Sequence, residues 1–138
     1  MSTAFFVTGT DTGAGKTFTS TVLLHVLRQR GLRAVGMKPV ASGSESTPDG
    51  LRNEDALALQ AASDPRPDYA LVNPFALREP TAPEIAAKLD GVVVTLPPIV
   101  EAFDALKASA DVVLVEGVGG FLAPIRDDFD QCELPRAM

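Results

Sequence analysis

The apolar residues of this 138-residue chain fall into short continuous runs separated by stretches with helical spacing. Such runs predict strands, the first of them buried, at residues 4–8, 33–37 and 111–116. Between the first two runs, Phe18, Val22 and Val26 recur every fourth residue, which predicts a helix with an apolar face. Strand, helix and strand in succession are typical of an α/β chain with parallel strands.

The remaining segments continue this alternation. Asn53 precedes Glu54 and Asp55 and predicts a capped helix, because an Asn side chain accepts a hydrogen bond from the first turn. The other expected elements are a loop at 41–52, a short strand at 69–75 and helices at 83–89 and 98–108. Together they predict one domain over residues 1–138, with a parallel sheet covered by helices on both faces.

Composition and charge exclude several classes of partner. Apolar residues make up 46% and charged residues 22% of the chain, as in a folded globular protein. The net charge of −6 argues against binding to nucleic acid or to an anionic membrane, since both need clustered Lys and Arg. The apolar runs are far shorter than the roughly 20 residues of a membrane-spanning helix. Cys132 is the single cysteine and has no partner for an internal disulfide, so we expect a cytoplasmic protein.

A glycine-rich segment joins the first strand to the first helix, with the sequence Gly9-Thr10-Asp11-Thr12-Gly13-Ala14-Gly15-Lys16-Thr17. Glycines let backbone N–H groups turn toward phosphate oxygens, and the helix N-terminus adds a partial positive charge. Lys16 is placed for the terminal phosphates of ATP, and the Thr17 hydroxyl for Mg²⁺. Five residues rather than four separate Gly9 from Gly15, so the alternative is a glycine-rich turn without a ligand. We predict a P-loop NTPase-like fold.

Further polar residues stand at the same edge of the predicted sheet. Glu116 ends the third apolar run, where ligands bind in parallel α/β proteins, and is either a magnesium ligand or a solvated acid before a turn. Lys38 follows the second run, and it either stabilises charge during phosphoryl transfer or is solvated. Asp55 would stabilise its helix N-terminus even without a metal.

In this order the motifs closely resemble the dethiobiotin synthetase family. The resemblance covers roughly residues 3–130. It rests on the glycine-rich segment, Lys38-Pro39-Val40-Ala41-Ser42-Gly43, Leu51-Arg52-Asn53-Glu54-Asp55-Ala56 and Val115-Glu116-Gly117-Val118-Gly119-Gly120. Asn73-Pro74 and Glu79-Pro80-Thr81-Ala82-Pro83 are also similar to the family. Glu84 departs from it, because the family commonly has His at this position.

The resemblance implies an ATP- and Mg²⁺-dependent ligase of biotin synthesis. Such an enzyme joins CO₂ to 7,8-diaminononanoate through a carbamate that ATP phosphorylates, and it releases dethiobiotin, ADP and phosphate. By motif match, Lys38 and Lys16 would be catalytic, Ser42 would contact the diamine, and Thr17, Asp55 and Glu116 would hold Mg²⁺. The nucleotide site would comprise Gly13, Ala14, Gly15, Lys16, Thr17, Phe18, Asp55, Glu116, Gly117, Val118 and Gly119.

Family members continue beyond the position of Asp130 through strands and helices that recognise adenine and form a homodimer. The resemblance therefore implies that residues 1–138 are the N-terminal portion of a longer family domain, truncated after the Glu116 strand. Two alternatives remain open: a truncated, inactive relative that binds phosphates, and another P-loop ATPase or amidoligase. Partitioning ATPases carry an extra Lys early in the loop, where this chain has Asp11, and this disfavours that class.

Overall fold

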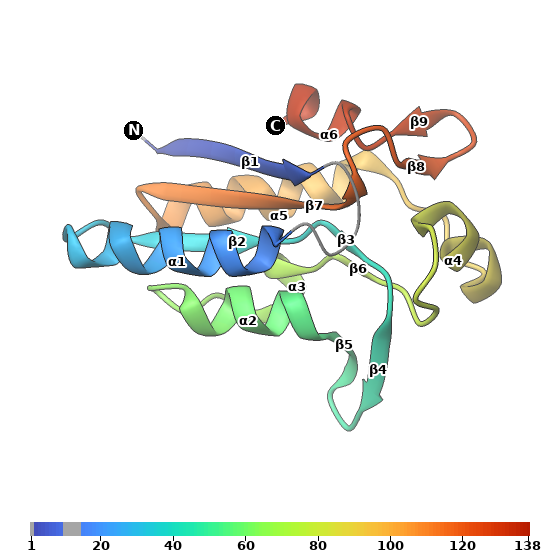
Figure 1. Cartoon of the computed structure of the whole chain (residues 1–138), viewed down its shortest axis with the longest axis horizontal. Coiled ribbons are helices and arrows are strands. Elements are labelled where there is room, and N and C mark those ends of the chain that lie inside the picture. The colour runs from blue at the N-terminus through green and yellow to red at the C-terminus, as the bar shows by residue number, and fades with distance from the viewer. Residues whose placement is uncertain (1, 10–14) are drawn as a thin grey trace.

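The computed structural model describes residues 2–9 and 15–138, and Figure 1 shows how the elements are arranged. The helices are α1 (Lys16–Gln29), α2 (Glu54–Ala62), α3 (Tyr69–Val72), α4 (Pro83–Asp90), α5 (Leu96–Ser109) and α6 (Glu133–Ala137). The strands are β1 (Thr3–Gly9), β2 (Ala34–Met37), β3 (Val40–Ala41), β4 (Ser44–Thr47), β5 (Gly50–Asn53), β6 (Phe75–Ala76), β7 (Val112–Gly120), β8 (Pro124–Arg126) and β9 (Phe129–Asp130). None of the described helices is long and apolar enough to cross a membrane.

A parallel sheet in the order β1–β7–β2 forms the centre of the fold (Figure 1). Val112 of β7 lies opposite both Thr3 of β1 and Ala34 of β2, so the three strands start at the same level. Their carboxyl ends consequently meet at one edge, where ligands bind in folds of this class. β7 extends to Gly120, beyond the predicted end at residue 116, because its pairing with β1 resumes between Gly9 and Gly120.

Helices cover both faces of this sheet. Successive residues of β7 point to opposite faces. Val113 and Val115 belong to the apolar cluster that includes α4 and α5 residues, whereas Val112 and Leu114 belong to the cluster that includes α1 and α2 residues. The predicted α/β fold, with a parallel sheet between two helical layers, is confirmed.

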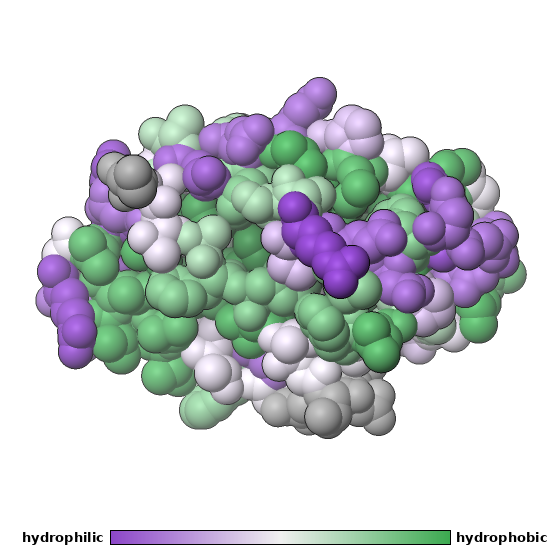
Figure 2. Space-filling view, turned by 90° about the horizontal axis from the view of Figure 1, so that it is seen from above, coloured by the Kyte–Doolittle hydropathy of each residue, from purple (hydrophilic) through white to green (hydrophobic). Residues whose placement is uncertain are grey.

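The position of β1 differs from the prediction, because β1 is an edge strand and not a buried one. Phe5 is 49% exposed, and within the described residues no strand pairs with the free side of β1. Phe18, Val22 and Val26, predicted to form the apolar face of α1, are exposed as well, while Leu24 is fully buried. α1 packs on β2 and α2. Because the sheet ends at β1, the side of α1 that carries Phe18, Val22 and Val26 is left uncovered. Figure 2 looks down on this edge and shows broad hydrophobic areas.

Two segments adopt other structures than their sequences predict. Residues 41–52, predicted as a loop, contain the β4–β5 hairpin, whose turn is closed by a hydrogen bond from the Thr47 hydroxyl to Gly50 O at 2.7 Å. Residues 69–75, predicted as a strand, form the single turn of α3 followed by β6, and Asn73 N donates to Tyr69 O at 2.8 Å to close that turn. Both structures depend on local turn hydrogen bonds, which the hydrophobic pattern does not reveal.

The predicted helices at 83–89 and 98–108 correspond to α4 and α5. Asn53 caps α2 as predicted, since its Oδ1 accepts from Ala56 N at 3.1 Å. Gly31 follows α1 with φ 81°, the left-handed conformation expected of a glycine just beyond a helix end. These capping signals were readable because they act over only a few residues.

Candidate functional site

The carboxyl edge of the sheet borders a cavity of about 680 Å³. Lys16 and Thr17 reach this cavity from the first turn of α1, Lys38 from the end of β2, and Glu116 from β7. The other predicted site residues in its lining are Gly15, Phe18, Ser42, Asp55, Val118 and Gly119. The predicted Gly13 and Ala14 lie outside the described residues.

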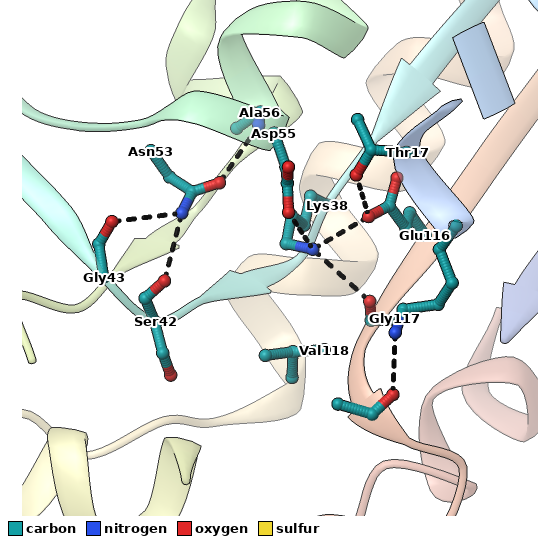
Figure 3. Close-up of polar contacts among 12 residues, drawn as sticks. Thr17, Lys38, Ser42, Gly43, Asn53, Asp55, Ala56, Glu116, Gly117 and Val118 are labelled. Carbon is teal, nitrogen blue, oxygen red and sulfur yellow. Dashed lines mark hydrogen bonds and ion pairs between the residues drawn. The ribbon is translucent and has the colours of Figure 1, made fainter. Parts of the chain in front are cut away.

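The ammonium group of Lys38 lies among the acidic residues of the cavity (Figure 3). Its Nζ is 2.9 Å from Glu116 Oε1, 3.3 Å from Asp55 Oδ2 and 3.4 Å from Gly117 O. Lys38 and Glu116 are only 4% and 1% exposed, whereas the Asp55 side chain is 46% exposed. Because buried charges must be compensated, Lys38 and Glu116 hold each other in place. The Lys38 ammonium group is therefore fixed at the cavity wall, with its charge balanced by the two carboxylates.

The first turn of α1 contributes a second cation and a hydroxyl. Lys16 Nζ donates to Gly119 O at 3.0 Å, and Lys16 is 8% exposed. The Thr17 hydroxyl donates to Glu116 Oε1 at 2.6 Å. α1 has no acidic residue in its first turn, so the partial positive charge of its N-terminus is available to an anion in the cavity.

The oxygen atoms at this end of the cavity fit a magnesium ion. Glu116 Oε2 is buried and has no hydrogen-bond partner among the described residues, which is costly unless a cation binds there. Thr17, Asp55 and Glu116 offer hydroxyl and carboxylate oxygens, the ligand type that Mg²⁺ prefers. The part of the chain that the structure describes contains no cluster of three or more His, Cys, Asp or Glu suited to a metal.

Ser42 lines the same cavity, and its Oγ is buried without a hydrogen-bond partner in the described residues. Its backbone carbonyl accepts from Asn53 Nδ2 at 3.0 Å, so the Ser42 hydroxyl is held at the cavity and left available to a ligand. Glu84, by contrast, does not line the cavity. It pairs with Lys88 one turn later on α4, at 2.8 Å.

Sequence reasoning missed Gln131, which is fully buried beside the end of β7. Its Oε1 accepts from Val118 N, and its Nε2 donates to Gly120 O at 2.7 Å. A Cβ atom on Gly117 would lie 2.9 Å from the Gln131 amide, so this clamp requires glycine there. A glutamine 11 residues beyond Gly120 and outside every motif carries no signal of such a role. The segment from Pro80 to Pro83 was singled out in the sequence without a role, and it lines the cavity.

Known proteins resemble this chain over nearly its full length. The profile of a protein family described as AAA domain matches residues 3–131. An "ATP-dependent dethiobiotin synthetase BioD" of Xanthomonas axonopodis pv. citri is 65% identical over 135 residues, covering 98% of this chain and 60% of that protein. A protein of the same name from Xylella fastidiosa (strain 9a5c) is 63% identical over 135 residues, with the same coverage. The resemblance seen in the motifs is confirmed, and the chain spans about 60% of the length of these curated relatives.

Proposed function

This chain belongs to the AAA domain family, and we propose that it forms the nucleotide-binding part of an ATP-dependent dethiobiotin synthetase. The observation that carries the proposal is the cavity in which Lys16, Lys38 and a buried Glu116 with an unpartnered oxygen lie together. Lys16, Lys38 and a Mg²⁺ ion bound at Glu116 would suit a reaction between two anions, the carbamate and ATP. The similar proteins are named ATP-dependent dethiobiotin synthetases, which supports this proposal.

In the proposed reaction, one amine of 7,8-diaminononanoate adds to CO₂ and loses a proton to give a carbamate. A carbamate oxygen then attacks the γ-phosphorus of ATP, and the bond to the β-phosphate oxygen breaks to release ADP. The second amine attacks the carbonyl carbon of the mixed anhydride and loses a proton, and phosphate leaves as the ureido ring of dethiobiotin closes. The phosphoryl transfer brings the anionic carbamate and the anionic phosphates of ATP together, which requires positive charge at the reacting atoms.

The roles of the two lysines follow from their positions. Lys16, at the start of α1, would bind the terminal phosphates together with the backbone N–H groups of the helix N-terminus. Lys38, held by Glu116 and Asp55, would stabilise the carbamate and the negative charge that develops on the transferring phosphoryl group. Both lysines are almost fully buried, so water screens their charges less than it would at the surface.

Magnesium would be held by Thr17, Asp55 and Glu116. When bound, Mg²⁺ neutralises charge on the ATP phosphates and orients them. The Ser42 hydroxyl, without a partner of its own in the described residues, would bind the diamine. Phe18 is 76% exposed beside the phosphate-binding residues and would lie against the nucleotide.

The whole protein is proposed to be a cytoplasmic homodimer that binds neither nucleic acid nor membrane. The net charge of −6 of residues 1–138 disfavours both of these partners. The exposed apolar edge at β1 indicates that further structure packs there in the active assembly. The second candidate is a phosphate-binding relative without catalysis, since Lys16 and the N-terminus of α1 could bind phosphate in either case.

The test is dethiobiotin formation by the full-length protein from 7,8-diaminononanoate, bicarbonate, ATP and Mg²⁺, followed by mass spectrometry. We expect one ADP per dethiobiotin and no product without bicarbonate. ADP release without dethiobiotin would reject the synthetase and leave another ATPase. Binding of ATP with neither product would support the non-catalytic candidate. A Glu84→Gln variant is a matched control, because Glu84 lies outside the cavity lining and should leave turnover unchanged.

A further inference from the structure

Three buried or half-buried residues behind the cavity are joined by a continuous set of hydrogen bonds. Asn53 N donates to the Tyr69 hydroxyl at 2.8 Å, and that hydroxyl donates to Asn73 Oδ1 at 2.9 Å. Asn53 and Asn73 are 5% and 3% exposed. None of the three lines the cavity, and the sequence motifs gave Tyr69 no role. We call Asn53, Tyr69 and Asn73 the tyrosine bridge.

One end of the tyrosine bridge holds Lys38. Asn73 Nδ2 donates to Lys38 O at 2.8 Å, and Lys38 N donates to Val72 O at 2.7 Å. Both backbone polar groups of Lys38 are therefore bonded to the end of α3. Because α3 is a single turn that begins at Tyr69, the position of the Lys38 backbone depends on where Tyr69 is held.

The other end of the tyrosine bridge holds Asp55 and Ser42, which are predicted to bind magnesium and the diamine. Asn53 Oδ1 caps α2, whose first turn carries Asp55, and Asn53 Nδ2 donates to Ser42 O at 3.0 Å and Gly43 O at 3.3 Å (Figure 3). Asp55 and Ser42 are thus tied to the same amide. The ion pair between Lys38 and Asp55, at 3.3 Å, spans the two ends of the bridge.

The Tyr69 hydroxyl can join a hydrogen-bond donor to a hydrogen-bond acceptor. It accepts from a backbone N–H and donates to an amide oxygen, so it must carry its proton. Burial raises the pKa of Tyr69, which keeps the phenol protonated, although the Asn53 hydrogen bond and the Arg52 charge act in the other direction. The Arg52 guanidinium stacks 4.2 Å from the ring centroid and fixes the ring.

We propose that Tyr69 is a positioning residue that sets the separation of Lys38 and Asp55 across the cavity, acting through Asn73 at one end and Asn53 at the other. The inference rests on the proposed function for the roles of Lys38 and Asp55. Tyr69 itself touches neither nucleotide nor diamine. Its effect passes through the backbone of Lys38 and the cap of α2.

The test is a double-mutant cycle between Tyr69→Phe and Asp55→Asn in the full-length protein. Binding of a non-hydrolysable ATP analogue is measured by calorimetry over a magnesium titration. Tyr69→Phe keeps the ring under Arg52 and removes only the hydroxyl. We expect it to raise the magnesium concentration required for binding by about tenfold, as loss of a supporting contact behind a metal ligand does. With Asp55→Asn already present, Tyr69→Phe should change that concentration little.

Ser63→Ala is the matched control, since the buried Ser63 hydroxyl also makes two hydrogen bonds, from Gly36 N and to Leu59 O. It should lower the thermal midpoint without shifting the magnesium requirement. If Tyr69→Phe and Asp55→Asn act independently, or if Tyr69→Phe changes only the thermal midpoint, the proposal is overturned. Should Tyr69→Phe fail to fold, Asn73→Ser breaks the same bridge at the Lys38 end and is judged by the same criteria.

The proposed function and this inference can fail separately. A wild-type protein that forms no dethiobiotin but binds the magnesium–nucleotide complex would reject the synthetase, while the binding cycle would still decide the role of Tyr69. An active wild type with additive effects in the cycle would reject the role of Tyr69 alone. In an active enzyme, Tyr69→Phe should also lower kcat more than it raises KM for ATP, because Lys38 acts on charge that develops during the reaction.

Discussion

Lys38 Nζ lies 2.9 Å from Glu116 Oε1, and both residues are buried, at 4% and 1% exposed. Thr17 and Asp55 contact the same pair, so one buried ion pair connects α1, β2, α2 and β7. This arrangement gives Lys38 both a structural and a chemical role, and the two roles can be separated by mutation.

We predict that Lys38→Met lowers the free energy of unfolding by about 3–5 kcal/mol, because it leaves the Glu116 carboxylate buried without its cation. The double variant that also carries Glu116→Gln should recover much of that loss, since neither member of the pair is then charged. Chemical denaturation of the three proteins measures this. Equal stability of the single and double variants would show that Lys38 does not offset the free-energy cost of burying the Glu116 carboxylate.

For catalysis, Lys38→Ala should lower turnover much more than it weakens ATP binding. The reason is that the charge it stabilises develops mainly on the transferring phosphoryl group and the carbamate. Dethiobiotin formation and ATP affinity are measured on the same full-length protein. Losses of the same size in both would reduce Lys38 to an ordinary phosphate contact.

Lys16→Gln should weaken nucleotide binding by tenfold or more while the fold is retained. A charge-assisted hydrogen bond to phosphate contributes about 1.5–3 kcal/mol, and glutamine supplies no charge. Calorimetry with ATP and circular dichroism measure the two effects. Unchanged ATP affinity would contradict the assignment of residues 9–17 as a phosphate loop.

Two substitutions of Thr17 separate the contribution of its hydroxyl group from that of the helix N-terminus on which it lies. Thr17→Ser retains the hydroxyl and should bind the magnesium–ATP complex nearly as the wild type does, whereas Thr17→Val should lose about tenfold, the effect of one contact to a charged group. Removal of Mg²⁺ with a chelator should abolish the difference between the two variants. A Thr17→Val protein with an unaltered magnesium requirement would remove Thr17 from the ligand set.

Stability at acidic pH should depend on Asp111, which lies at the end of the sheet remote from Glu116. Hydrogen bonds from the Arg33 side chain, at 2.9 and 3.3 Å, and from Arg33 N, at 2.8 Å, lower the pKa of Asp111 from 3.8 to about 2. A carboxyl whose pKa is lowered by folding stabilises the folded state above its unfolded pKa, and the contribution is lost as the pH falls through the folded pKa.

Asp111→Asn should therefore be less stable than the wild type above about pH 4, and the difference should vanish near about pH 2. Urea denaturation of both proteins across this range measures the difference. Because Asp111 is solvent-accessible, added salt should reduce it. A difference that stays constant down to pH 2 would contradict the ion-pair explanation.

The 138-residue chain expressed alone should be poorly soluble, bind the magnesium–ATP complex weakly and form no dethiobiotin. Phe5, Phe18 and Leu122 are 49%, 76% and 70% exposed, and the free side of β1 offers unpaired backbone groups. An exposed apolar edge strand promotes aggregation. Replacing Phe5 with Gln should improve solubility more than replacing the more exposed Leu89 of α4, at 67%, because Phe5 lies on the edge strand β1. A soluble chain with a cooperative thermal transition and measurable product would contradict this expectation.

Much of the fold and several of the candidate site residues could be predicted from local sequence. The run at 111–116 is a strand, the Asn53 cap begins α2, and Pro83 lies in the first turn of α4, because each depends on interactions within a few residues. Gly15, Lys16 and Thr17 were identified because a strand, a glycine-rich turn and a helix follow one another along the chain. Hairpin β4–β5 and helix α3 were missed, since side-chain hydrogen bonds in turns determine them.

The sequence by itself determined which residue types stand at the ends of the strands, and therefore that Lys16, Lys38 and Glu116 lie at one edge of the sheet. Only the tertiary structure decided how they are paired. The ion pair of Lys38 with Glu116 joins residues 78 positions apart, and the Gln131 clamp on Val118 and Gly120 joins separate elements. Tyr69 acquires its role in the same way, by the packing of α3 behind Lys38. Such long-range contacts depend on which strands lie next to each other in the sheet. The local pattern of apolar and polar residues does not encode this strand order.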